Sequence, residues 1–341
     1  MNEPIFIARQ DTLEQEILPA HWLAQYKLFG EESYTFQDKG IWKKLCMSSA
    51  AANDRDIHAE ALEEMLTTFS AEHTGKWMLL VYGTNAAALE GLATMAAIAA
   101  NGTAMGAIVD NALLMHAIAN SETAMQRIAN SQTAMQRVAN NRGAMDAIGR
   151  SRIARDAVQA SPYYNSCIKE NDMAIAKLAV ALANLESAGY SGMAGVAADS
   201  TAMTAVAASA TAMTAVAASS TAMTAVAASA TAMGKIAAVD AALSKLAAST
   251  TAMDALYARK KQMKGGSASK SGKFIILEIS QSNAFNTSKY GYATLSDGSK
   301  PDWSSYLAKY AFFQKYPKYA TYMLNDTDSD DYIYYFDIAS P

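Results

Sequence analysis

Four aspartates near the C-terminus have the spacing of oxygen ligands for a calcium ion. They stand at positions 1, 3, 5 and 12 of a twelve-residue segment and are Asp326, Asp328, Asp330 and Asp337. Hard cations such as Ca²⁺ bind carboxylate oxygens arranged in this way. However, Asp331 occupies the sixth position, where a calcium loop of the EF-hand type needs glycine, and aromatic residues follow in place of an exit helix. The segment fits either a calcium site or a solvated acidic turn before a terminal strand.

A second group of candidate side chains is the aromatic block that precedes these aspartates. Between residues 303 and 322 the aromatic positions are spaced largely three or four apart, which predicts a helix with an aromatic core face. Tyrosine and tryptophan also suit recognition of sugars or proteins, because each combines apolar area with a polar group. The rings fit either ordinary core and surface positions or receptor contacts. The candidate contacts are Trp303, Tyr306, Tyr310, Tyr316 and Tyr319.

Signatures of enzymatic chemistry are weak throughout the chain. His58 and Glu60 have the H-x-E spacing of zinc deaminases, but no P-C-x-x-C segment follows, and the chain has only two cysteines. The histidines show no metal-ligand spacing, and no G-x-S-x-G, Walker or G-x-G-x-x-G motif occurs. We therefore expect no enzyme and no cofactor apart from the calcium ion considered above. A small enzyme domain within residues 1–82 or 274–341 is the alternative.

The middle of the chain, between these candidate side chains, is dominated by a ten-residue repeat, Thr-Ala-Met-x-x-(Ile/Val)-Ala-x-Ser-x. It recurs with little change between residues 201 and 240 and in diverged form between residues 85 and 160. A fixed period is the signature of a repeat architecture. Such arrays more often make rods, spacers and binding surfaces than enclosures for catalytic groups.

Each repeat predicts one short helix. Apolar residues at positions i, i+1, i+4 and i+5 form a single helix face, and the serine two residues before each threonine has the position of an N-cap. We predict helices of about seven or eight residues, stacked as an α-solenoid with methionine and Ile/Val buried between neighbours. The predicted repeat core comprises Met95, Met105, Met125, Met135, Met145, Met203, Met213, Met223, Met233, Met253, Ile98, Ile108, Ile128, Val206, Val216, Val226 and Ile236.

One continuous helix is the alternative for the second array. Ten residues at about 100° each fall roughly 80° short of three turns, so the apolar stripe would rotate around a straight helix and match neither coiled-coil geometry. Asparagine, which tolerates the conformation that ends helices, precedes the serine in the first array. Alanine replaces it in the second array, as at Ala208, so the break there is specified only loosely.

The chain is expected to be mainly helical, with a small mixed N-terminal domain and a small α+β C-terminal domain. In the N-terminal domain the pattern predicts helices over 12–28 and 54–69 and a strand over 77–82. Glycine and serine in 264–273 predict a flexible linker. The predicted divisions are 1–82 (attachment or capping domain), 83–160 (first array), 161–192 (interruption at Pro162), 193–263 (second array), 264–273 (linker) and 274–341 (aromatic-rich domain).

Composition restricts the partners and the compartment. The net charge of -4 gives no electrostatic attraction to nucleic acid. Two cysteines, Cys46 and Cys167, fit folding in a reducing cytoplasm, and the first residues lack the pattern of a signal peptide. Residues 200–234 are uncharged and long enough to cross a bilayer, but their Ala, Thr and Ser content argues against a membrane span.

The segment Ser-Ala-Thr-Ala-Met-Thr-Ala-Val-Ala at 209–217 resembles the Ala-rich repeats of tail-fibre and other virion proteins of tailed bacteriophages. The resemblance extends over the two arrays and not over the flanking domains. It implies a non-enzymatic virion component, made in the host cytoplasm, as a monomer or a homo-oligomer. A repeat spacer would join an attachment domain to a domain that meets a host receptor, a glycan or another virion protein.

A surface-adhesion or ice-binding repeat protein is the alternative for the same array. Ice binding requires regular threonines on one flat face, for which Thr201, Thr211 and Thr221 are the candidates. In the first array, charged residues such as Glu122 and Arg127 interrupt this regularity.

Overall fold

The computed structural model describes residues 55–68, 74–75, 78, 86–89, 91–280, 291–303, 306–326 and 331–341. The predicted helix over 12–28, most of the predicted strand over 77–82, and Asp328 and Asp330 lie outside these residues. As expected from the sequence, the described chain is mainly helical, and an antiparallel sheet lies near its C-terminus. It divides into two compact units, residues 1–168 and 169–341.

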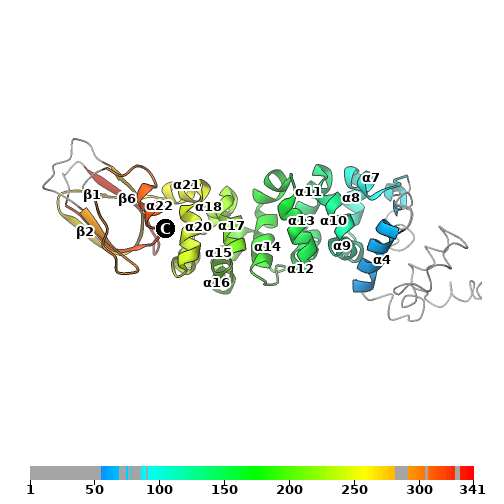
Figure 1. The fold of residues 1–341 in the computed structure, drawn as a ribbon, viewed down its shortest axis with the longest axis horizontal. Coiled ribbons are helices and arrows are strands. Elements are labelled where there is room, and N and C mark those ends of the chain that lie inside the picture. Colours follow the sequence, from blue (N-terminus) through cyan, green and yellow to red (C-terminus); the bar gives the residue numbers. More distant parts are fainter. Residues whose placement is uncertain are drawn as a thin grey trace, which may run out of the picture. The chain divides into compact units, whose positions relative to one another are not determined.

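The first unit contains one longer helix and the helices of the first array (Figure 1). The longer helix, α4, runs from Arg55 to Thr68, close to the predicted range of 54–69. The others are α6 (Ala86–Leu89), α7 (Met95–Ala100), α8 (Gly102–Val109), α9 (Ala112–Ala119), α10 (Glu122–Ala129), α11 (Gln132–Ala139), α12 (Arg142–Arg150) and α13 (Arg152–Ala160), followed by the π-helix η4 (Tyr164–Lys169).

The array helices are short because most repeats supply their own N-cap. Ser121, Ser131 and Asn141 have extended backbones, and each side-chain oxygen accepts a hydrogen bond from the amide three residues further along. The chain changes direction at these residues, so that α8 and α9 are inclined by 102°. One repeat therefore makes one helix.

Successive helices coil so that each one packs on the third helix further along. In the first unit α8 packs on α11, α9 on α12 and α10 on α13. At the start of this stack, α4 packs on α9 and α10. One coil therefore consists of three helices, that is, of three ten-residue repeats. After one coil the chain lies against the helix with which that coil began.

The second unit repeats this arrangement. Here α14 packs on α17, α15 on α18, α16 on α19, α17 on α20 and α18 on α21. The second array is therefore broken into short helices and is not one continuous helix. Their bounds are α14 (Asp172–Leu182), α15 (Met193–Ala198), α16 (Ser200–Ala208), α17 (Ala210–Ala218), α18 (Ser220–Ala227), α19 (Ala230–Ala237), α20 (Asp240–Ala247) and α21 (Thr250–Tyr257).

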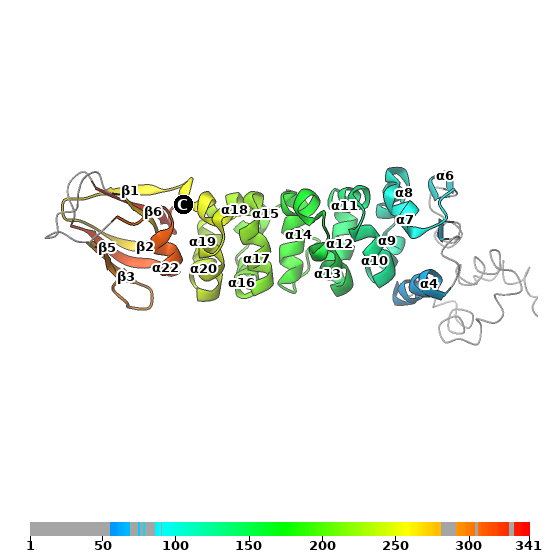
Figure 2. The ribbon, with the colours of Figure 1, turned by 45° about the horizontal axis from the view of Figure 1, so that its top comes forward.

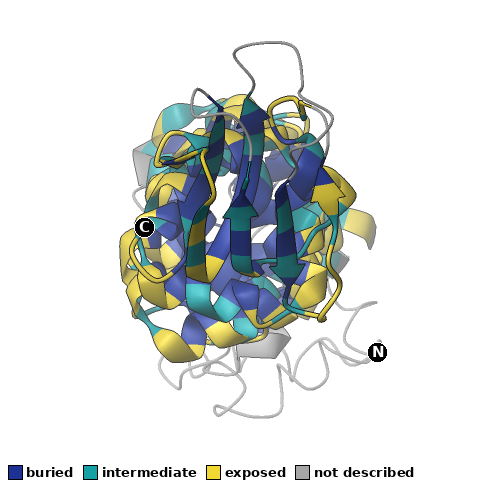
Figure 3. Cartoon of the chain, turned by 90° about the vertical axis from the view of Figure 1, so that its left-hand side faces the viewer, coloured by how far each residue is buried: buried dark blue, intermediate teal, exposed yellow. Residues whose placement is uncertain are grey.

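A six-stranded antiparallel sheet follows α21 in the same unit (Figure 2), with strand order β1-β6-β2-β5-β3-β4. The first half of β2 pairs with β5 and its second half with β6. Along β3, and along β6 as far as Tyr335, buried positions alternate with partly exposed ones; Figure 3 shows such alternation on the sheet. The elements are β1 (Lys261–Lys264), β2 (Ala268–Ser280), β3 (Gly291–Leu295), β4 (Asp302–Trp303), α22 (Ala311–Lys315), β5 (Ala320–Asn325) and β6 (Tyr332–Asp337).

The sheet contributes to two cores. One is internal to it and contains Phe274, Met323 and Phe312. The other is continuous with the Met/Val core of the second array, which Ile275 and Phe336 join together with Leu277, Tyr310, Phe313 and Ile338. The sheet therefore covers the apolar end of the second array.

Two sequence predictions in this region are wrong. Residues 264–273, predicted as a flexible linker, form the end of β1, a turn, and the first half of β2, because Ala268–Ser271 pair with β5. The predicted helix over 303–322 is reduced to α22. Tyr310 before it has a left-handed backbone with φ 73°, and Pro317 after it cannot continue a helix.

No single helix in the described part of the chain is both long and apolar enough to cross a bilayer. The pairs α8–α9 and α16–α17 reach that length and hydropathy only when both helices are counted, and each pair is bent by 102°.

Candidate functional site

Serines at several repeat junctions make two hydrogen bonds with different partners. In Ser229, the hydroxyl oxygen accepts a bond from the Ala232 amide, at 3.2 Å, and thereby caps α19. The same hydroxyl donates to the carbonyl oxygen of Ala197, at 2.6 Å, which lies 32 residues earlier in α15. One side chain therefore starts its own helix and ties it to the preceding coil.

This double contact recurs in both units at the same spacing of 32 residues. Because the bond spans one coil plus two residues, it fixes the register between coils as well as the start of each helix. The other pairs are Ser131 with Ala99, Ser151 with Ala119, Ser161 with Ala129, and Ser249 with Ala217.

Removing the Ser229 hydroxyl should destabilise the second unit by about 2 kcal/mol. About 1 kcal/mol comes from the lost cap, and a similar amount from the lost bond to the Ala197 carbonyl. We expect Ser229→Ala to lower the free energy of unfolding in urea by this amount. Ser219→Ala is the matched control, because Ser219 caps α18 but shows no cross-coil bond among the described residues. Equal losses in the two variants would mean that the cross-coil bond contributes nothing.

The predicted repeat-core residues are all buried, with side chains at most 3% exposed. In the second unit the methionine and valine or isoleucine of each repeat join one continuous cluster. The methionine sulfur atoms are thus enclosed among apolar neighbours, where they fill space between short helices.

Two glutamates outside the repeat pattern bind helix N-termini. Glu63 of α4 accepts hydrogen bonds from the Ser121 hydroxyl (2.5 Å) and from the Thr123 amide (3.1 Å) and hydroxyl (2.5 Å) at the start of α10. Glu170 does the same for Ser220 and Thr221 at the start of α18, through both amides and both hydroxyls. A carboxylate is favoured there because the helix N-terminus carries positive potential. The partners are 50 to 60 residues distant in sequence, so no local pattern indicates these contacts.

The Glu170 contact predicts a pH-dependent contribution to stability. Burial alone would raise the pKa of Glu170, but the hydrogen bonds from Ser220 and Thr221 outweigh it and hold the pKa below its usual value. A lowered folded-state pKa stabilises the fold above the unfolded pKa of about 4.3, and this stability is lost as the pH falls through the folded value. We expect Glu170→Gln to lower the free energy of unfolding by up to about 1 kcal/mol at pH 7, a value limited by solvent screening. At low pH we expect the variant and the wild type to be equally stable.

Thermal unfolding followed by circular dichroism between pH 7 and pH 2 measures this difference. Glu60→Gln, at an exposed position of α4, should unfold like the wild type throughout the range. A constant gap between Glu170→Gln and wild type down to pH 2 would contradict the assignment.

Charged and aromatic side chains surround the junction between α21 and the sheet. Asp254 accepts hydrogen bonds from the Tyr310 hydroxyl and from Lys309 Nζ, and these bonds hold the pKa of Asp254 below its usual range. Tyr257 donates to Glu278 at 2.5 Å; burial, reinforced by this bond, raises the pKa of Tyr257. Polar contacts therefore border the apolar interface between the array and the sheet.

Two of the five predicted receptor contacts do not lie on the surface. Trp303 and Tyr310 are 3% and 8% exposed, and a Cβ atom on Gly291 would lie 2.3 Å from Trp303 Nε1. This corrects the predicted contact set, because these two rings belong to the packing of the sheet. Tyr316 and Tyr319 are partly buried, and Tyr306 is 49% exposed.

The predicted calcium ligands do not all meet at one point. Asp326 accepts a hydrogen bond from Ser267, whereas Asp337 pairs with Lys261 Nζ at 3.4 Å. Asp337 ends β6, about 16 Å along an extended strand from Tyr332, where the acidic segment ends. Calcium ligands lie 2.3–2.6 Å from the ion, so Asp337 cannot complete this site. Within the described residues no group of three His, Cys, Asp or Glu side chains is placed to hold a metal ion.

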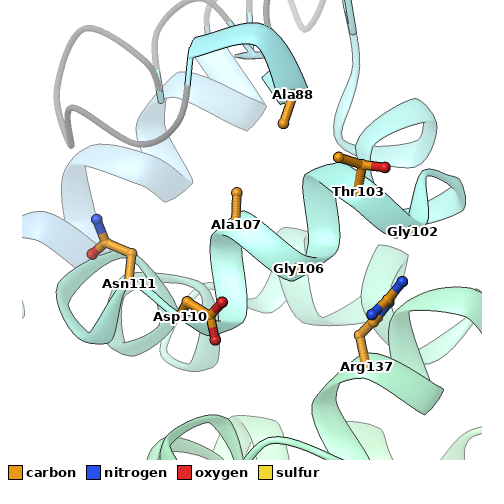
Figure 4. A pocket seen from close by; sticks show the side chains of 8 residues that line it. All are labelled: Ala88, Gly102, Thr103, Gly106, Ala107, Asp110, Asn111 and Arg137. Carbon is orange, nitrogen blue, oxygen red and sulfur yellow. The ribbon is translucent and has the colours of Figure 1, made fainter.

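The first unit has an open pocket of about 550 Å³ beside α8 (Figure 4). Gly102 and Gly106 of α8 form part of its wall. At the equivalent repeat positions, 20 residues later, α10 carries Glu122 and Gln126 instead of glycine. Gly106 leaves the helix surface bare, since nothing lies within 4 Å of a Cβ placed there, whereas a Cβ on Gly102 would lie 3.4 Å from the Arg137 guanidinium. Ala88, Thr103, Ala107, Asp110, Asn111 and Arg137 complete the lining.

No protein-family model matches the chain, and no curated protein is significantly similar to it in sequence.

Proposed function

We propose that this chain is a non-enzymatic structural protein of a virion, a phage tail fibre or a protein associated with one. In this proposal the arrays form an α-solenoid that acts as a spacer. It joins N-terminal residues that attach to other virion proteins to a C-terminal sheet that meets a host receptor, a glycan or another virion protein. The support comes from the repeat itself and from its resemblance to phage repeats.

The observation that carries the spacer proposal is the cross-coil bond of the junction serines. It recurs at five junctions with the same spacing of 32 residues, and it needs only the neighbouring coil. A stack built on contacts between neighbours can be lengthened by whole repeats without a new core. The sheet would then end the stack, which supports a spacer that presents a terminal domain.

Geometry counts against the ice-binding alternative. Thr201 and Thr211 belong to α16 and α17, which are inclined by 102°, so consecutive repeats do not share a flat face. In addition, the hydroxyl of the candidate Thr221 donates to the Glu170 carboxylate at 3.0 Å and is already used within the protein.

A length series tests the spacer. Residues 201–230 can be duplicated in phase with the repeat, once and three times, in the full chain. Each added coil should lengthen the particle by about 10 Å, the packing distance of helices. The same 30 residues in a straight helix would add about 45 Å. The maximum dimension from small-angle X-ray scattering distinguishes the two, and the mass in solution gives the oligomeric state.

Antibody labelling in electron microscopy tests the virion assignment. Antibodies against the C-terminal sheet should label particles released from the cells that produce this protein, at their tails or fibres. The protein found only in the soluble fraction, with unlabelled particles, would overturn the assignment.

A further inference from the structure

A row of partly exposed tyrosines extends from the array onto the sheet. Residues 332, 334 and 336 share one face of β6, because side chains alternate along a strand. Phe336 packs into the core of the array, and the same face continues with Tyr334 and Tyr332 at partly exposed positions. Tyr257 at the end of α21 extends the row. The ring centroids are 6.4 Å apart between Tyr257 and Tyr334, and 6.2 Å between Tyr334 and Tyr332. We call these three residues the tyrosine row.

Polar side chains flank the row on both neighbouring strands. Directly opposite Tyr334 stand Gln262 on β1 and Glu278 on β2. Residues paired in this way present their side chains on the same face. Opposite Tyr332, in the same manner, stand Lys264 and Ser280. Gln262 and Lys264 are exposed.

Two lysines border the row, although the chain as a whole carries a net charge of -4. Lys260 Nζ lies 4.0 Å from the ring centroid of Tyr257 and 5.7 Å from that of Tyr334. Among the described residues, no carboxylate forms an ion pair with Lys260 or Lys264, whereas the Glu278 carboxylate accepts the Tyr257 hydroxyl. Two ammonium groups therefore border the row and are available to an anionic ligand.

We propose that the tyrosine row, with Lys260 and Lys264, binds an acidic oligosaccharide such as a uronate-containing chain. The rings of Tyr332 and Tyr334 are nearly parallel, at 22°, and offer apolar area to the faces of successive sugars. The Tyr257 ring is tilted by 53° from that of Tyr334, and the lysines would pair with the carboxylates of the sugars. A protein partner typically inserts apolar or aromatic anchors into pockets. This surface is a strand face bordered by polar side chains, which favours the glycan. The inference rests on the proposed role of the C-terminal sheet in receptor contact.

Calorimetric titration of the full chain with hexagalacturonate, at low ionic strength, tests the proposal, with maltohexaose as the neutral probe. We expect hexagalacturonate to bind at least about tenfold more tightly than maltohexaose. The double variant Lys260→Gln/Lys264→Gln should lose about tenfold or more in affinity for hexagalacturonate, since even one charge-assisted bond contributes about such a factor. The double variant Lys235→Gln/Lys300→Gln removes the same charge elsewhere in the unit and should bind like wild type.

Tyr332→Ala separates stacking from charge, with its folding checked by circular dichroism. It should weaken hexagalacturonate binding while leaving the weak binding of polyglutamate unchanged. Absence of hexagalacturonate binding, equal affinity for maltohexaose, or a Tyr332→Ala variant with wild-type affinity would each overturn the proposal. Tight polyglutamate binding that depends on the lysines alone would identify an acidic protein surface as the partner and would also overturn it. The length series needs no ligand, so a negative titration leaves the spacer proposal standing. Equally, a length series that contradicts the spacer leaves the result of the titration valid.

Discussion

Phe336→Asp should destabilise the second unit by more than about 4 kcal/mol. Phe336 is fully buried and joins the core of the second array. Removal of a buried phenylalanine side chain typically costs about 3–5 kcal/mol through lost contacts and the cavity, and the added carboxylate would be buried without a partner. Because the sheet covers the apolar end of the array, we expect the loss to extend into the helices. Hydrogen exchange measured by mass spectrometry should show faster exchange in α19, α20 and α21.

The control for this variant is Ser271→Asp, which adds the same charge at an exposed position of β2. It should leave exchange in the array unchanged. Fast exchange confined to β2, β5 and β6 in Phe336→Asp, with α19–α21 as protected as in wild type, would mean that the array is stable without the sheet. In that case the sheet would be a tethered domain and not a cover for the core.

The repeat helices were predictable because every determinant is local. The apolar positions and the serine N-cap lie within ten residues, and they define both where a helix begins and which face is buried. Many of the array helices accordingly begin directly after serine, as at Ser209 and Ser249, and others begin after asparagine, as at Asn141. The stacking of every third helix was not predictable in this way. It depends on the angle between helices and on bonds such as that from Ser229 to Ala197, which join residues in different coils.

The C-terminal region shows the opposite situation, in which tertiary pairing overrides local pattern. The segment 264–273 has the composition of a linker, yet half of it is a strand because β5 supplies hydrogen-bonding partners. The aromatic spacing over 303–322 matches a helix, but these rings are spread over β4, α22 and β5.

The candidate site was only partly predictable. Tyrosine enrichment indicated a recognition surface in this region, but the residues that face outward follow from strand register, as for Tyr332 and Tyr334. The lysine beside them, Lys260, comes from the end of the array, so its proximity to Tyr334 required the fold.

Met213→Ala should lower the stability of the second unit by about 3 kcal/mol, within the 2–5 kcal/mol usual for removal of a large buried apolar side chain. Met213 is fully buried in α17, which packs on both α14 and α20, so the cavity lies between coils and breaks contacts in two directions. Met213→Leu conserves the side-chain volume and should lower the free energy of unfolding by less than about 1.5 kcal/mol. Thr214→Ala, at the exposed neighbouring position, should stay within about 0.5 kcal/mol of wild type. Urea unfolding of the three variants gives these values. A Met213→Ala variant as stable as Thr214→Ala would show that the coils do not depend on the repeated methionine, and the stacked core that supports the spacer would then need another basis.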